Sequence, residues 1–323
     1  MNLKLLFIAC LFLSRIPEIY AQPINNTASY RALRDSKYIR FYYDNDFFTS
    51  TDGNYTQGLN FEIVHPVIGK SPVCKLLVSL KGSEKKYGMS LEHLGYTPSS
   101  IRHVEIIYGD RPFSATLYLK TFKQSFDTTR NIMFTSIIDL GGIGPVAGGE
   151  WMQKTIHRNL NNIEPLGWHN QIKNDIVVNY SIILEKALIQ KSDKFMLSSI
   201  TKLNAGTLRD NIATGFSAVG GKFSNPFFTV VPLEKNFHIK FYASSLINLV
   251  GYDASLQGGL FNRESPYTIT ARDISRIVWS TEAGIIAQFK KLSLEYFQHI
   301  KSREFKTGTY HRWGGIRIGL NMG

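Results

Sequence analysis

Apolar and polar side chains alternate along most of this chain. In residues 237–249, FHIKFYASSLINL, apolar residues occupy nearly every second position and polar residues fill most of the positions between them. A period of two predicts a β-strand with one apolar and one polar face. Twelve segments, some with less regular alternation than this one, are separated by clusters of Gly, Asn, Asp, Ser and Lys; they cover residues 38–44, 58–65, 86–93, 113–122, 131–140, 175–188, 194–204, 212–220, 237–249, 276–287, 291–300 and 312–322.

The length and number of these segments favour a membrane barrel. Several have ten or more residues, the length that a tilted strand needs to cross a bilayer. We therefore predict an all-β fold, a twelve-stranded antiparallel outer-membrane β-barrel. The strands of a soluble periplasmic β-sandwich also alternate apolar and polar residues, so this is the other architecture that the pattern allows. The chain ends in Gly323, whereas many such barrels end in an aromatic residue.

The N-terminus has the pattern of a secretory signal peptide. Lys4 precedes an apolar run over residues 5–13, and Ala21 offers a small residue at a cleavage site. The run is too short to span a bilayer as a helix. We expect residues 1–21 to be a signal peptide and residues 22–323 to be the barrel domain, in which Cys74 is the one remaining cysteine.

The net charge narrows the class of partner. Lys and Arg number 37 against 25 Asp and Glu, which gives a net charge of +12. A basic protein attracts nucleic acid, anionic lipid or polyanionic glycolipid. Because the signal peptide predicts export, we expect no nucleic-acid partner and a location in the cell outer membrane. Aromatic residues make up 13% of the chain, and Tyr and Trp are favoured at membrane interfaces.

One segment departs from the period of two. Residues 148–161, GGEWMQKTIHRNLN, follow a glycine-rich stretch and place Trp151, Ile156 and Leu160 at spacings typical of an amphipathic helix. The turn NIEPLGW comes next and contains Pro and Gly. In a barrel, such a helix must lie at a rim or inside the lumen.

This helix carries the candidate catalytic base. Gln153 and His157 are four residues apart, so they share one helix face, and Glu164 follows shortly after the helix. An imidazole beside a carboxylate is suited to general-base catalysis, because the carboxylate fixes the tautomer of the ring. The simpler alternative is a rim histidine hydrogen-bonded to backbone.

An acidic stretch near the first predicted strand is the candidate cation site. Residues 44–61, DNDFFTSTDGNYTQGLNF, bring together Asn45, Asp46 and Thr56. Carboxylate, amide, hydroxyl and carbonyl oxygens suit Ca²⁺ better than zinc, which prefers His and Cys. The spacing is not that of an EF-hand, and an ordinary Asn/Asp turn is the alternative.

Five blocks of sequence follow one another along the chain. They are DNDFF with TD and NYTQG (44–58), GDRPF (109–113), LG through GP (140–145), the pair Gln153 and His157, and EPLGW with NQ (164–171). No single block is specific, but their order and spacing are. Together they resemble one family, the outer-membrane lipid A 3'-O-deacylases, and the resemblance spans nearly the whole chain after the signal peptide.

The resemblance implies a twelve-stranded barrel and a Ca²⁺-dependent hydrolase that removes the 3'-linked acyl group of lipid A. In the implied mechanism His157 activates water and the cation stabilises the oxyanion. The implied metal ligands are Asp46 and Thr56. Glu164 keeps the Glu-Pro-x-Gly-Trp frame, although a tighter count from His157 ends at Asn162 or Ile163. The implied catalytic residues are Asn45, Asp46, Thr56, Gln153, His157 and Glu164.

Charge and location also suggest how the substrate is held. Lipid A carries phosphates, so basic residues near the GDRPF block are candidates to bind them, with Arg111 and Lys120 the chosen pair. A structural pairing of Arg111 with Asp110 is the alternative. We expect lipid A or lipopolysaccharide as substrate and a monomeric protein. The competing function is a non-enzymatic outer-membrane pore or binding barrel whose rim helix plugs the lumen.

Overall fold

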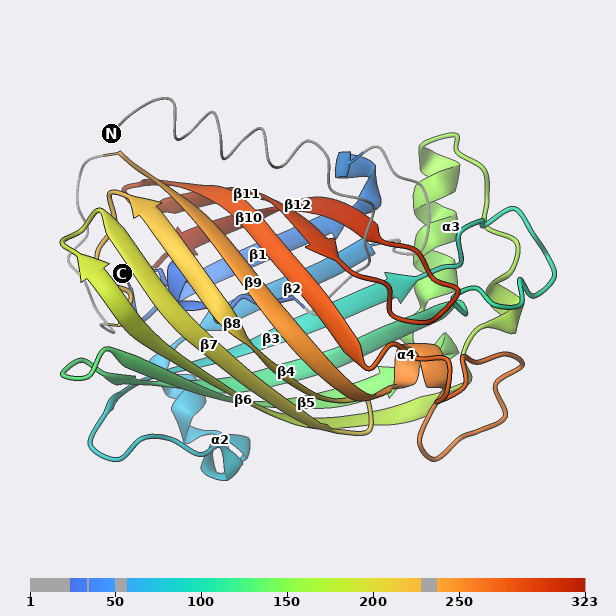
Figure 1. Ribbon diagram of the computed structural model, residues 1–323, viewed down its shortest axis with the longest axis horizontal. Coiled ribbons are helices and arrows are strands. Elements are labelled where there is room, and N and C mark those ends of the chain that lie inside the picture. Colours follow the sequence, from blue (N-terminus) through green and yellow to red (C-terminus); the bar gives the residue numbers. More distant parts are fainter. Residues whose placement is uncertain (1–23, 34, 50–56, 228–236, 323) are drawn as a thin grey trace.

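A computed structural model describes residues 24–33, 35–49, 57–227 and 237–322 (Figure 1). The predicted signal peptide lies outside these residues. Twelve antiparallel strands form a closed barrel in which each strand pairs with its neighbours in sequence and β1 pairs with β12, so that Tyr38 lies opposite Asn321. The strands are β1 Tyr38–Asn45, β2 Gln57–Val64, β3 Glu84–Tyr96, β4 Ser114–Asp127, β5 Ile132–Ile143, β6 Asp175–Lys191, β7 Phe195–Gly206, β8 Arg209–Gly221, β9 His238–Asp253, β10 Ile277–Phe289, β11 Leu292–Lys301 and β12 His311–Asn321.

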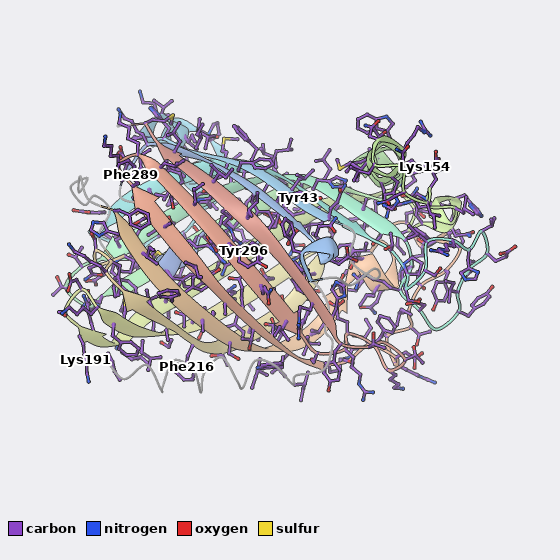
Figure 2. All side chains as sticks on the ribbon, turned by 90° about the horizontal axis from the view of Figure 1, so that it is seen from above. Tyr43, Lys154, Lys191, Phe216, Phe289 and Tyr296 are labelled. Carbon is purple, nitrogen blue, oxygen red and sulfur yellow. The ribbon has the colours of Figure 1, made fainter. Side chains whose placement is uncertain are left out.

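The alternation places apolar residues on the outside of the wall. In β9, Phe241 and Leu249 are 52% and 54% exposed, whereas His238 and Lys240 are buried on the lumen side. Apolar side chains also cover the outside of other strands, as Phe216, Phe289 and Tyr296 do (Figure 2). A soluble sandwich would bury this face, but a membrane barrel presents it to lipid. The predicted barrel is confirmed, and the sandwich alternative is wrong.

The two ends of the barrel differ. One end has short turns at residues 128–131, 192–194 and 290–291, together with α2 (Val73–Leu76) and the 3₁₀-helix η4 (Pro66–Lys70). The other end, called the α3 rim here, has the long loops 97–113, 144–174 and 254–276 (Figure 1). These loops hold α3 (Gly149–Asn159), α4 (Ala254–Gln257), and the 3₁₀-helices η5 (Pro145–Ala147) and η6 (Trp168–Asn170). The helix predicted over residues 148–161 is confirmed as α3.

The lumen is filled by residues that precede the first strand. Ile24, Ala28, Tyr30 and Leu33 are all buried, and they belong to one core cluster with residues of the barrel wall. This segment includes the 3₁₀-helix η2 (Ser29–Arg31). By contrast, α3 stands at the rim beyond the strand ends (Figure 1). The competing prediction that the rim helix plugs the lumen is therefore wrong, because a different segment occupies that space.

None of the helices within the described ranges is long and apolar enough to cross a membrane.

Candidate active site

The N-terminal end of α3 is fixed to the outside of the barrel. A Cβ on Gly149 would overlap the side chain of Ala115 in β4 and would lie 2.8 Å from the indole of Trp168. Trp168 is fully buried and packs on Phe113, with ring centroids 5.0 Å apart. Only glycine allows the helix to approach the wall this closely. The glycine-rich sequence before α3 thus determines where its side chains are presented.

Gln153 is a buried residue that ties α3 to the following loop. Its side chain is 3% exposed, and its Oε1 accepts a hydrogen bond from Trp168 Nε1 at 2.6 Å. Because a buried indole N–H needs an acceptor, this contact explains an amide at position 153 without any catalytic role. The lone pair of Oε1 that faces Trp168 is occupied, so a role in catalysis would have to come from another part of the amide.

His157 is fixed by backbone. Its Nδ1 lies 2.6 Å from the carbonyl oxygen of Ile163, and a carbonyl only accepts hydrogen bonds. A neutral imidazole must therefore carry its proton on Nδ1 and keep the lone pair of Nε2 free to act as a base. The simpler alternative of a rim histidine bonded to backbone is what the structure contains, and it produces the tautomer that a general base requires.

Glu164 does not form the expected contact with His157. Its carboxylate pairs with Arg158, with Arg158 Nε 3.0 Å from Oε1, and both side chains are exposed. The hydrogen bond from Arg158 lowers the pKa of Glu164; Lys154 and His157 contribute smaller electrostatic effects in the same direction. The assignment of Glu164 as the residue that orients the imidazole is therefore corrected, because the backbone of Ile163 has that position. The tighter count from His157 thus ends at the residue that contacts the ring, but the contact comes from the backbone of Ile163 and not from a side chain.

Asn45 and Asp46 lie where β1 ends at the α3 rim. Asp46 begins the 3₁₀-helix η3 (Asp46–Thr49) and is 8% exposed, and Asn45 is hydrogen-bonded to Tyr43. A Cβ on Gly314 would lie 2.8 Å from Cβ of Phe48, so glycine lets η3 pack against β12. Thr56, the other predicted metal ligand, lies outside the described residues.

The donor set at this hairpin fits a hard cation in part. The carboxylate of Asp46 and the amide oxygen of Asn45 are the ligand types that Ca²⁺ prefers. Over the ranges that the structure describes, no three His, Cys, Asp or Glu side chains come together as a metal site. A site built here would therefore need backbone or hydroxyl oxygens in addition to Asp46.

The two halves of the predicted site share one rim. The region around α3 packs on β4, and η3 packs on β12, so β1, β2 and β3 lie between them in the barrel wall. Residues 50–56, which link η3 to β2, are outside the described part. The structure thus places His157 and Asp46 at the same end of the barrel.

His93 is a residue of this region that sequence reasoning missed. It is on β3 at an outward-facing position, yet it is 4% exposed because the chain near Ala147 covers it. Neither of its ring nitrogens has a partner with good hydrogen-bond geometry among the described residues. The sequence feature that marks His93 is a histidine at a position where the alternation places lipid-facing residues. Polar groups at such positions are rare and usually functional.

Arg111 and Lys120 do not lie where a rim phosphate could reach them. Arg111 is 2% exposed and pairs with Glu304, and its Nη2 donates to Ser255 Oγ at 2.6 Å. The alternation of β4 places Lys120 in the lumen, where its Nζ lies 2.6 Å from Oε2 of Glu92. Both were predicted to bind substrate, and both predictions are wrong, because each cation already has a buried carboxylate partner.

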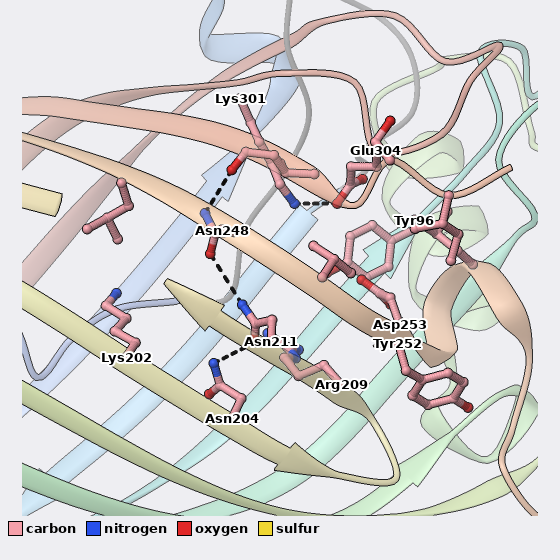
Figure 3. Close-up of a pocket in the computed structure, with 16 residues that line it drawn as sticks. Tyr96, Lys202, Asn204, Arg209, Asn211, Asn248, Tyr252, Asp253, Lys301 and Glu304 are labelled. Atoms are coloured by element: carbon pink, nitrogen blue, oxygen red, sulfur yellow. Dashed lines mark hydrogen bonds and ion pairs between the residues drawn. The ribbon is translucent and has the colours of Figure 1, made fainter. Parts of the chain in front are cut away.

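A cavity of about 70 Å³ lies inside the barrel beneath α4 (Figure 3). Asparagines of three neighbouring strands form a ladder along it: Asn204 Nδ2 donates to Asn211 Oδ1 at 2.7 Å, and Asn211 Nδ2 to Asn248 Oδ1 at 3.2 Å. Its lining residues include none of the predicted catalytic residues. This cavity therefore belongs to the lumen and is separate from the residues around α3.

Comparison with known proteins decides the family. A family model described as "Outer membrane protein LpxR" matches residues 5–322 of this chain. The chain belongs to the LpxR outer membrane protein family. This confirms the resemblance predicted from the five sequence blocks and supports an outer-membrane location.

A solved structure, LpxR from Salmonella typhimurium, has the same fold as this LpxR family member. Its TM-score is 0.71 at 19% sequence identity, with 88% of this chain and 100% of that chain covered. The β domain of the Bordetella autotransporter BrkA gives a TM-score of 0.44 at 8% identity, covering 89% of this chain and 99% of that chain. A search of curated proteins finds no match.

Proposed function

We propose that this protein is a lipid A 3'-O-deacylase that hydrolyses the 3'-linked acyl ester of lipid A in the outer membrane. The observation that carries the proposal is the contact between His157 Nδ1 and the carbonyl of Ile163, which leaves Nε2 available as a base on a rim helix. Membership of the LpxR family supports the same activity.

His157 acts as the general base. Its Nε2 takes a proton from a water molecule as the oxygen of that water attacks the ester carbonyl. The imidazolium then returns the proton to the leaving alkoxide, so that a fatty acid and a free 3'-hydroxyl are formed. The carbonyl of Ile163 holds the ring in one orientation throughout. The Arg158–Glu164 pair restrains the same turn at its exposed surface.

The surface of α3 suits an amphiphilic substrate in a membrane. Trp151 and Leu160 are 72% and 66% exposed, and Lys154 and Arg158 lie on the same helix. Figure 2 shows Lys154 on the part of the chain that projects beyond the barrel wall. Exposed apolar side chains with neighbouring cations match acyl chains and phosphates that meet at the membrane surface.

Asp46 and Asn45 would hold a divalent cation, most suitably Ca²⁺, together with Thr56 and backbone oxygens. When bound, such an ion stabilises the negative charge that develops on the ester carbonyl oxygen. The role of Asp46 itself is to supply a carboxylate that is already positioned by η3 at the end of β1.

The decisive measurement is mass spectrometry of lipid A from cells with and without the gene. We expect the loss of one 3'-linked acyl unit only when the protein is present. Unchanged lipid A in cells that contain folded, heat-modifiable barrel would refute the proposed reaction.

A second measurement tests the cation. Purified protein is treated with EDTA and then resupplied with Ca²⁺ or Mg²⁺. We expect deacylation to stop and to return with Ca²⁺, and Asp46→Asn to weaken that return. Full activity after thorough chelation would remove the metal from the proposal while leaving the hydrolase activity in place.

A further inference from the structure

Residues 24–33, called the N-terminal plug here, run through the lumen of the barrel. An eight-stranded barrel is filled by its own side chains, whereas barrels of sixteen strands or more leave an aqueous channel. A barrel of twelve strands lies between these sizes. Its lumen therefore needs additional filling if it is to be closed.

The barrel wall binds the backbone of the plug from several sides. Side chains on β1, β3, β4 and β6 point inward and contact plug carbonyls or an amide, as a binding site for an extended peptide does. The contacts are Arg40 Nη1 to Asn26 O at 2.6 Å, Arg40 Nη2 to Arg31 O at 3.0 Å, Lys86 Nζ to Leu33 O at 3.0 Å, Gln124 Nε2 to Thr27 O at 2.9 Å, and Ser29 N to Glu185 Oε1 at 3.2 Å.

Arg31 is the main side-chain anchor of the plug. It is 3% exposed and pairs with both Glu282 and Glu295, with Nη2 2.9 Å from Oε1 of Glu295. The same Nη2 donates to the hydroxyl of Tyr242 at 2.6 Å. Tyr30 stacks on Tyr242 with ring centroids 4.4 Å apart. The wall thus offers a carboxylate pair and an aromatic face to one Tyr-Arg sequence of the plug.

Asn26 connects the plug to the two strands that flank β1 in the wall, β2 and β12. Its Nδ2 donates to Asn60 Oδ1 at 2.9 Å, and its Oδ1 accepts from Arg317 Nε at 3.0 Å. Both polar atoms of the amide are therefore used by wall residues of β2 and β12. Such complete pairing is typical of a built, specific contact.

The space beside the plug is small. A cavity of about 60 Å³ lies between plug residues 24–27 and the wall, and one of about 70 Å³ lies closer to α4 (Figure 3). Lys202, Asn204 and Arg209 line both cavities. Volumes of this size hold a few water molecules.

We propose that the N-terminal plug is a lumen-bound segment that closes this barrel to ions, and that the inward-facing wall is its binding site. The plug thereby keeps the lumen closed to ions, while the rim loops carry the residues for the proposed chemistry. The proposal is independent of the proposed hydrolase activity, because it concerns a compartment that contains none of the predicted catalytic residues.

Planar-bilayer recording of the purified full chain and of a variant lacking residues 24–33 tests the proposal. We expect no channel current from the wild type and stable single-channel currents from the deletion. Heat-modifiable migration on gels reports folding of both proteins. A folded deletion variant that stays silent overturns the proposal, and so does a wild type that conducts as much as the deletion.

Because the deletion could prevent folding, Arg31→Met provides a second test. It retains an apolar stem but removes the guanidinium N–H groups that Arg31 donates to Glu282, Glu295 and Tyr242. We expect brief openings that the wild type lacks. The matched control is Arg130→Met, at a turn where the arginine side chain is 76% exposed, and it should stay silent. Arg31→Met that is as silent as this control contradicts the proposal.

A peptide experiment tests specificity. The decapeptide INNTASYRAL, which has the sequence of residues 24–33, is added to the conducting variant, either the deletion or Arg31→Met. We expect it to reduce the open-channel current, whereas the same peptide carrying Arg31→Glu should not. Equal block by both peptides would show nonspecific occlusion and would refute the proposed binding site.

Discussion

Charged side chains behave differently in the lumen and at the α3 rim. In the lumen, Arg31 pairs with both Glu282 and Glu295, and all three side chains are almost completely buried. At the rim, Arg158 and Glu164 are exposed, and His157 is held by a single backbone carbonyl. A buried pair is costly to break, because the remaining charge loses its partner and has no water, whereas an exposed pair contributes little.

The difference teaches that residue type alone does not mark a functional site in a barrel. Arginine, glutamate and lysine are frequent in the lumen, where they fill space and satisfy each other. At the α3 rim, Arg158 and Glu164 stay exposed and are therefore accessible to a substrate. The four predictions below test this division between structural and chemical roles.

The largest effect is expected for His157→Ala. Removal of a general base typically lowers the rate by about 10²–10⁴-fold. The matched control is His169→Ala, an exposed histidine in the same loop, which should retain wild-type deacylation of lipid A by mass spectrometry. Full activity in His157→Ala would place the chemistry outside α3.

Arg111→Met should reduce stability and leave chemistry intact. Burial raises the pKa of the partner Glu304, but Lys301 and Arg111 outweigh burial and bring that pKa below the usual carboxyl value. Glu304 therefore remains charged, and the substitution would remove one of its two cations. We expect a loss of about 3–5 kcal/mol, measured as a lower temperature of barrel unfolding on gels. Lys306→Met, which breaks an exposed pair with Asp273, should cost about 0–1 kcal/mol. Reduced affinity for lipid A in folded Arg111→Met would restore the phosphate-binding role.

Gln153→Met should loosen α3. The substitution leaves the buried indole N–H of Trp168 without an acceptor, which costs about 1–3 kcal/mol of stability. We expect faster hydrogen exchange in residues 149–159 with the barrel unchanged. Gln153→Glu keeps an acceptor and is the control. If Gln153→Glu preserves the protection of α3 but abolishes deacylation, Gln153 acts on the substrate as well.

The smallest effect is expected for Glu164→Gln, because the carbonyl of Ile163 fixes the His157 tautomer. Deacylation should stay close to wild type and match that of Arg158→Gln. Because the pKa of Glu164 is lowered, the contribution of the Arg158–Glu164 pair depends on pH. The pair is fully formed above the usual carboxyl range and is lost as the pH falls through the lowered pKa. A loss of activity as large as that of His157→Ala would instead show that Glu164 is catalytic.

Much of the site region was accessible to prediction because it depends on local pattern. The helical spacing of Gln153 and His157 interrupts the period of two, so the sequence revealed both the helix and the shared face. The partners of these residues were not accessible. Ile163 contributes a backbone carbonyl, which leaves no trace in residue type, and Trp168 reaches Gln153 only because the loop folds back on α3.

The sequence by itself determined the twelve strands and their outward apolar face, because a lipid environment requires alternation in every strand. Only the tertiary structure decided what fills the lumen and which charges pair there. The plug has no periodic signature, and partners such as Arg31 and Glu295 are joined by closure of the barrel across 264 positions of sequence. Long-range pairing of this kind follows from how the strands close, which no local stretch of sequence specifies.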